Sequence, residues 1–205
     1  MNKSIKKFVA ILSAVAVICC AAIPAFATDI TTDGGNGTTP VNLSSTVDGT
    51  LDGDPAATAL SVTIPTSLPL AMSVDGDIAT ADNAKITNNS FGAVRVKTAT
   101  ISGANGWTLV AFGNKNTLAA EKVDSNKLGF SMSIGNGDWK NTNASGNTQT
   151  FISAPVEGCY MTGVGDTANN FATVDYDAIA TAVSEVVTAQ TVANVVFVVE
   201  FDTVG

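Results

Sequence analysis

Few side chains in this sequence could carry out chemistry, and their types exclude the commonest mechanisms. The 205 residues contain no histidine, which removes Ser-His-Asp and Cys-His catalysis, His-ligated zinc and the commonest general base. Paired carboxylates could hydrolyse glycosides across a cleft. Most acidic residues here lie in Gly- and Asn-rich stretches, where aspartate is typical of turns. We therefore expect no enzymatic activity, no catalytic residue and no cofactor.

Two Asp-Gly-Asp triplets, residues 52–54 and 75–77, suggest calcium because hard cations bind clustered oxygen atoms. Neither triplet continues into the spaced ligands and terminal glutamate of a calcium loop. A turn accounts better for Asp75 and Gly76, so no metal site is predicted. Weak calcium binding at Asp75 and Asp77 is the alternative left open.

Binding by aromatic stacking is the remaining chemistry, because exposed rings on a β-sheet can stack on sugars. The candidate ligand-binding residues are Trp139, Trp107 and Tyr160. Trp139 lies in the polar stretch 136–147, which is typical of an exposed loop. Trp107 follows a tight turn and shares a strand face with Leu109, which favours the rim of the core over a binding platform.

Residues 1–27 have the three-part pattern of a secretory signal peptide. Lys3, Lys6 and Lys7 precede an apolar run that ends near Ala25-Phe26-Ala27, and this order is typical of a cleaved export signal. The run is shorter than the roughly 20 residues of a membrane span. We expect cleavage after Ala27 and a secreted chain, extracellular or associated with the cell wall, without a membrane partner.

Charge and cysteine content narrow the partners further. Removing the signal leaves seven basic residues against 18 acidic ones, a net charge of −11, so nucleic acid is not an expected partner. Of the three cysteines only Cys159 remains, which excludes an intramolecular disulfide. We expect Cys159 to be a small, half-buried apolar residue, with intermolecular pairing as the alternative.

Two regions follow the signal. Residues 28–59 are rich in Thr, Gly and Asp and are predicted to form a flexible leader, in which residues 41–47 (VNLSSTV) are weakly strand-like. Residues 60–205 are predicted to be an all-β domain, an antiparallel two-sheet β-sandwich of Ig-like or jelly-roll-like type. The strand-like runs are residues 60–65, 70–81, 84–89, 93–102, 107–112, 127–134, 148–156 and 195–201.

Some strands can be placed from their composition. Pro65 and Pro69 place the first run at a sheet edge or crossover, and Asp75-Gly76 predicts the turn of a hairpin. Residues 195–201 (VVFVVEF) are apolar on both faces, which predicts a central strand. Residues 177–190 have both helical and alternating spacing, and we favour a strand followed by a polar turn over a helix.

Residues 60–112 and 190–203 resemble a group of small exported β-sandwich proteins of Gram-positive anaerobes. The shared features are VTIPTSLP, the Asn-Asn-Ser joint at residues 88–90 before a Val-x-Val strand, and the Gly-Trp-Thr turn at residues 106–108. GWTL also resembles the first Trp-x-Leu of WxL cell-wall-binding domains, although Phe197 and Phe201 stand near the position of the second. The architecture is also similar to that of camelysin-type matrix-fibre proteins.

The resemblance implies structural motifs and export for surface display or assembly. We therefore expect a nonenzymatic surface or matrix protein acting in adhesion, wall association or self-assembly, with a cell-wall polymer, a glycan or copies of itself as partner. A carbohydrate-binding module is the alternative. In one form of the self-assembly hypothesis, residues 41–47 add as a strand to a neighbouring copy, with a simple linker as the competing interpretation.

Overall fold

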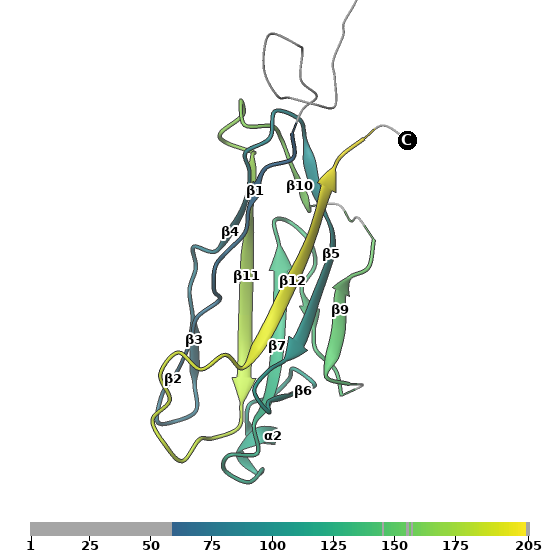
Figure 1. Ribbon diagram of the computed structural model, residues 1–205. Helices are drawn as coiled ribbons and strands as arrows, with labels where there is room; N and C mark the ends of the chain where they lie inside the picture. The colour runs from purple at the N-terminus through teal and green to yellow at the C-terminus, as the bar shows by residue number, and fades with distance from the viewer. Residues whose placement is uncertain (1–58, 145, 155, 157, 204–205) are drawn as a thin grey trace, which may run out of the picture. The chain divides into compact units, whose positions relative to one another are not determined.

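The protein folds as an all-β domain with almost no helix, as predicted (Figure 1). The structure is a computed structural model that describes residues 59–203 except 145, 155 and 157. These residues belong to the second of two units of the chain, which begins at Thr58. The signal peptide, the leader with residues 41–47, and the 52–54 triplet lie outside the described residues. Within the described part no helix has the length and apolar character to span a membrane.

Two larger sheets and a hairpin make up the domain. The first sheet has the order β1-β4-β11-β7-β6, with β8 also paired to β7, and the second has the order β10-β5-β12, with β9 also paired to β5. The strands of the first sheet are β1 (Val62–Thr63), β4 (Lys85–Asn88), β11 (Phe171–Ala180), β7 (Lys127–Ile134), β6 (Thr108–Val110) and β8 (Lys140–Asn141). Those of the second are β10 (Tyr160–Met161), β5 (Val94–Gly103), β12 (Ala193–Phe201) and β9 (Thr148–Ile152).

The domain also contains a hairpin and one parallel strand pair that the sequence did not predict. β2 (Leu70–Met72) and β3 (Ile78–Thr80) pair around Gly76, whose φ of 74° suits the predicted turn. β6 and β7 pair in parallel, unlike the other strand pairs of the described residues. A parallel pair needs a long connection, and here residues 111–126 supply it and carry the short helix α2 (Asn116–Ala119).

The core draws side chains from both larger sheets. Phe130 lies between two other rings, with centroid distances of 6.3 Å to Phe151 and 5.9 Å to Tyr176. The Tyr176 hydroxyl donates to the Pro69 carbonyl at 3.0 Å and so fastens the segment before β2 to this core. The fully buried side chains include Ile86, Val94, Val96, Ile101, Leu128, Met132, Met161 and Val174.

β5 keeps one apolar face although its alternation changes phase. Val94, Val96, Ala99 and Ile101 are all buried. In the register with β12, Val199 lies opposite Val96 while Val198 lies opposite Thr98, so the extra residue is in β5. This bulge restores the apolar face, because an inserted residue shifts the alternation by one.

The structure decides two of the strand predictions. The run 195–201 is not central, because β12 pairs with β5 alone in the described part and forms an edge. The apolar residues on both faces of β12 are therefore not explained by a strand on each side, and those of one face, Val196 and Val198, are exposed. The preference for a strand over a helix at residues 177–190 is confirmed, since β11 continues to Ala180 and a loop follows.

Candidate functional site

Trp107 belongs to the core and presents no ring to a ligand. The preceding turn has positive φ at Asn105 (48°) and Gly106 (82°), the combination that a tight two-residue turn requires. The Trp107 N–H donates to the Ala104 carbonyl at 2.9 Å and closes this turn. Only 4% of Trp107 is exposed and it belongs to the core, so it lies deeper than the core rim that the sequence favoured.

The other two candidate aromatics are accessible. Trp139 is 53% exposed in the segment between β7 and β8, and Tyr160 is 44% exposed on β10. Both rings could stack on a flat ligand. Their sequence neighbours Asp138, Lys140 and Cys159 line one pocket, while the two rings do not.

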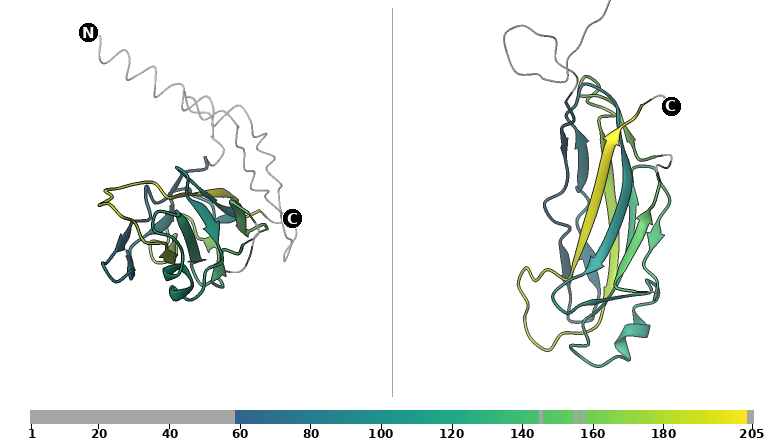
Figure 2. Two further views of the ribbon diagram at one scale, coloured as in Figure 1. Left: turned by 90° about the horizontal axis from the view of Figure 1, so that it is seen from below. Right: turned by 45° about the vertical axis from the view of Figure 1, so that its right-hand side comes forward.

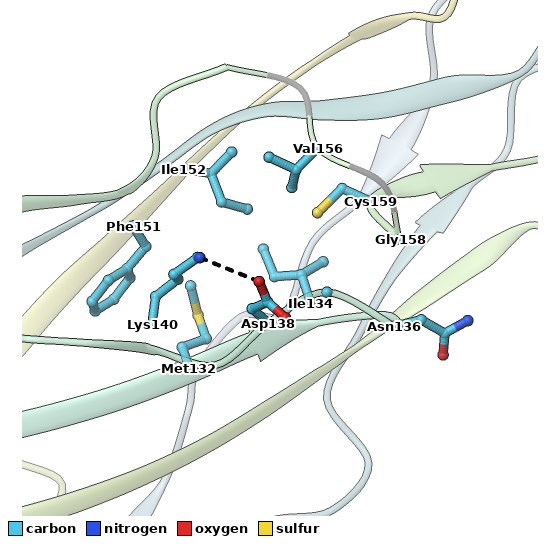
Figure 3. Close-up of a pocket in the computed structure, with 11 residues that line it drawn as sticks. Met132, Ile134, Asn136, Asp138, Lys140, Phe151, Ile152, Val156, Gly158 and Cys159 are labelled. Carbon is cyan, nitrogen blue, oxygen red and sulfur yellow. Dashed lines mark ion pairs between the residues drawn. The ribbon is translucent and has the colours of Figure 1, made fainter.

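This pocket has a volume of about 400 Å³ and an apolar floor (Figure 3). Met132 and Ile134 of β7 and Phe151 and Ile152 of β9 line the pocket, and Val156 and Cys159 lie beside Ile152. The pocket lining is apolar because β7 and β9 belong to different sheets and turn their core faces toward one another. A small apolar group would fit such a lining.

Two glycines allow two backbone segments to approach closely beside the pocket. Gly135 has a φ of 55°, and a Cβ added there would lie 2.2 Å from the Gly158 carbonyl oxygen. Gly158 itself has a φ of 92° and approaches the backbone of Asn136 and Gly137 in the same way. Glycines next to strand ends are the sequence signal for this close approach.

The ionisable groups of the pocket are poorly suited to reaction. Asp138 and Lys140 form an ion pair at 3.7 Å, but the Asp138 side chain is 92% exposed, so solvent screens the pair. Burial raises the pKa of the Cys159 thiol above its ordinary value, which keeps it protonated and weakly nucleophilic at neutral pH. Cys159 is only 1% exposed, more deeply buried than the half-buried position expected.

The aspartates of the predicted turn have other contacts. The Asp77 carboxylate pairs with the Lys115 ammonium, and the backbone N–H groups of Asp75 and Asp77 both donate to the Ser73 hydroxyl, at 3.3 Å and 3.2 Å. This is the arrangement of a side-chain-capped turn. In the part of the chain that the structure describes, no group of three or more Cys, Asp or Glu side chains is placed to hold a metal ion.

The Asn-Asn-Ser joint is a buried hydrogen-bonding centre. Asn88 is completely buried; its Nδ2 donates to the carbonyls of Gly92 at 2.8 Å and Thr162 at 2.7 Å. Its Oδ1 accepts from the Ser90 N–H at 2.8 Å. Ser90 Oγ in turn donates to the Ser61 carbonyl at 3.1 Å. The motif therefore fixes the crossing from β4 in one sheet to β5 in the other.

Exposed apolar side chains are the feature that sequence reasoning missed. Phe91 is 84% exposed beside Val164, which is 45% exposed, and the Val164 N–H donates to the Ser90 carbonyl at 2.8 Å. On β12, Val196 and Val198 are 55% and 45% exposed. The unbroken apolar run of β12 was a usable signal for this surface, but it was interpreted as central burial.

Comparisons with models of known protein families, with curated proteins and with solved structures find no match.

Proposed function

We propose that this is an exported, nonenzymatic protein that acts at the cell surface or in the extracellular matrix, through adhesion, wall association or self-assembly. We further propose that its two larger sheets form an antiparallel β-sandwich of Ig-like or jelly-roll-like type. The signal-like residues 1–27 and the resemblance to exported surface proteins of Gram-positive anaerobes support the location. The shared core of the two sheets supports the sandwich.

The observation that carries the proposal is the open edge of β12. This strand is nine residues long and pairs only with β5 among the described residues. An unpaired strand edge with exposed valines is a template for association with another chain. Such a surface favours a protein that works by contact with polymers or partners over one that transforms a small substrate.

Size-exclusion chromatography with light scattering on residues 28–205 tests this proposal, under reducing conditions that prevent Cys159 pairing. We expect a species heavier than one chain whose proportion rises with protein concentration. The same preparation is incubated with Gram-positive cell walls and sedimented. A monomer at every concentration that also stays in the supernatant contradicts the proposal.

Glycan binding is the second candidate, and the exposure of Trp139 favours it. Retention on a wall-polysaccharide column should then be lost in Trp139→Ala, because a stacking ring contributes much of a sugar site. Phe91→Ala is the matched control, since it removes another exposed ring elsewhere. Equal retention of both variants, or none for the unaltered protein, rules this candidate out.

The leader offers a separate route to assembly. Residues 41–47 could add as a strand to a neighbouring copy, and deletion of residues 28–58 should then reduce the assembled fraction. An unchanged assembled fraction leaves these residues as a linker.

A further inference from the structure

β12 differs from every other sheet edge in the described part of the chain by its length. The strands β1, β6, β8 and β10 have two or three residues each, and β9 has five. Proteins commonly keep edge strands short so that they do not pair with other chains. β12 has nine residues and lies beside β5 along most of its length (Figure 2). It therefore lacks the simplest protection against edge pairing.

The inner face of β12 is incompletely covered. On β5, Val94 and Val96 are 0% exposed and Ile101 is 1% exposed. The residues directly opposite on β12 are Phe201, Val199 and Val195, and all three are only partly buried. Both sets face the same core, so the difference arises on the side of β12 away from β5. A further strand there would cover this face.

The outer face and backbone of β12 also favour pairing. Val196 and Val198 project on the outer face and are about half exposed, and β-branched residues stabilise strand pairs. Residues 193–199 contain no Pro, Gly, Lys or Arg, the residues that blunt natural edges. The bulge beside Val198 lies in β5, so the β12 backbone is regular.

We propose that β12 of one copy pairs antiparallel with β12 of a second copy, about a two-fold axis at Phe197. This inference rests on the self-assembly part of the proposed function and names its partner. An antiparallel pair of identical strands gives a closed, isologous dimer. The resulting pairs are 193 with 201, 194 with 200, 195 with 199, 196 with 198, and 197 with 197.

Side-chain chemistry selects this register. It places Val196 of each copy opposite Val198 of the other on the outer face and pairs all nine residues. Glu200, already bound to Arg95 and Lys97, faces the neutral Asn194. A shift that puts Glu200 opposite Glu200 pairs like charges and is disfavoured.

A second β12 also suits the edge better than the leader. Seven of the nine residues of β12 are apolar, whereas residues 41–47 contain three apolar residues, Val41, Leu43 and Val47. The partly buried inner side chains of β12 require apolar coverage on the same face. The edge is therefore matched most closely by its own sequence.

Register-specific cross-linking tests the pairing on residues 28–205. Val196→Cys and Val198→Cys are prepared separately, and both sites are exposed, so folding should be retained. Directly opposite residues have Cα atoms about 4.5 to 5.5 Å apart, within disulfide range. After mild oxidation with oxidised glutathione, an equimolar mixture should give a cross-linked dimer that is weak or absent in either variant alone. The single variants also control for cross-links to Cys159.

A charge variant provides the second measurement. Val196→Lys places an ammonium within the paired surface and should raise the concentration for half-dimerisation about tenfold or more. Val186→Lys, at a 97% exposed loop position, is the matched control and should leave dimerisation unchanged. Circular dichroism confirms that both variants fold.

The outcomes separate this inference from the broader proposal. Assembly without the mixed cross-link, abolished by deletion of residues 28–58, overturns β12 pairing and leaves self-assembly through the leader. A monomer that still sediments with cell walls overturns β12 pairing and keeps wall association. A monomer without wall association overturns both.

Discussion

β5 and β12 are adjacent strands of one sheet that both turn apolar side chains toward the core, but their side chains are covered to very different extents. Val96 of β5 is completely buried, while Val199, directly opposite on β12, is only partly buried. The two strands turn the same kind of residue toward the same core. Their difference lies in neighbours, because β5 has strands on both sides and β12 on one.

The comparison shows that an apolar strand face indicates that the face must be buried. It does not indicate which element buries it. In β5 the requirement is met within the domain. In β12 it is partly unmet in the described chain, and the exposed valines of its outer face add to it. Matched substitutions in the two strands therefore measure how much a second neighbouring strand contributes to stability.

The largest difference is expected between two asparagines, Asn88 at the end of β4 and Asn194 near the start of β12. Asn88→Ala, ahead of β5, removes an amide that bonds Gly92, Thr162 and Ser90 and leaves buried polar groups without partners. We expect a loss of about 3 kcal/mol in the free energy of unfolding. Asn194→Ala in β12 is the matched control; because Asn194 is exposed, its effect should be within about 0.5 kcal/mol. Urea denaturation followed by circular dichroism measures both.

Similar losses for the two asparagine variants would show that the buried network does not fix the entry to β5.

A matched pair of valines tests coverage directly. Val96→Ala removes two buried carbon atoms and leaves a cavity, so we expect a loss of about 2 to 3 kcal/mol. Val199→Ala should cost about 1 kcal/mol in the monomer, because part of its side chain already contacts solvent. Denaturation at low protein concentration provides the comparison.

Raising the protein concentration sharpens the valine comparison. If a second copy covers β12, the cost of Val199→Ala should increase with concentration, since dimerisation stabilises the folded state. The cost of Val96→Ala should remain constant, and equal concentration dependence would contradict the role assigned to the edge.

Local patterns predicted much of the fold. The strand at residues 93–102, the Asp75-Gly76 turn and the preference for a strand followed by a turn at residues 177–190 were all predictable, because each depends on a few neighbouring residues. The edge position of β12 was not, since strand neighbours are determined by distant parts of the chain. The parallel β6–β7 pair was missed for the same reason.

The candidate site was predictable only in its exposed members. The polar surroundings of Trp139 indicated a loop, and the turn before Trp107 indicated the core rim. The pocket joins β7 to β9 and to residues near Cys159, and no local pattern indicates that these segments meet. The exposed Phe91 was hidden within a motif interpreted as a simple joint.

The smallest effect is expected from the ionic contacts that join β12 to β5. Glu200 accepts from Lys97 at 2.8 Å and from Arg95 at 3.0 Å, and these cations hold the pKa of Glu200 below its ordinary value of 4.5. A lowered pKa in the folded state means that the unfolded chain binds the proton more tightly. This contribution to stability is therefore present above pH 4.5 and is lost as the pH falls toward the folded pKa.

Glu200→Gln isolates this contribution, because the amide keeps the shape of the side chain without its charge. The variant should be slightly less stable than the unaltered protein at pH 7 and indistinguishable from it once the pH is below the folded pKa of Glu200. The effect should be small, since the ion pair is accessible to solvent and screened. Thermal denaturation across this range, repeated at high salt, measures the difference. A difference that persists at low pH would show that Glu200 stabilises the edge by the packing of its side chain and not by its charge.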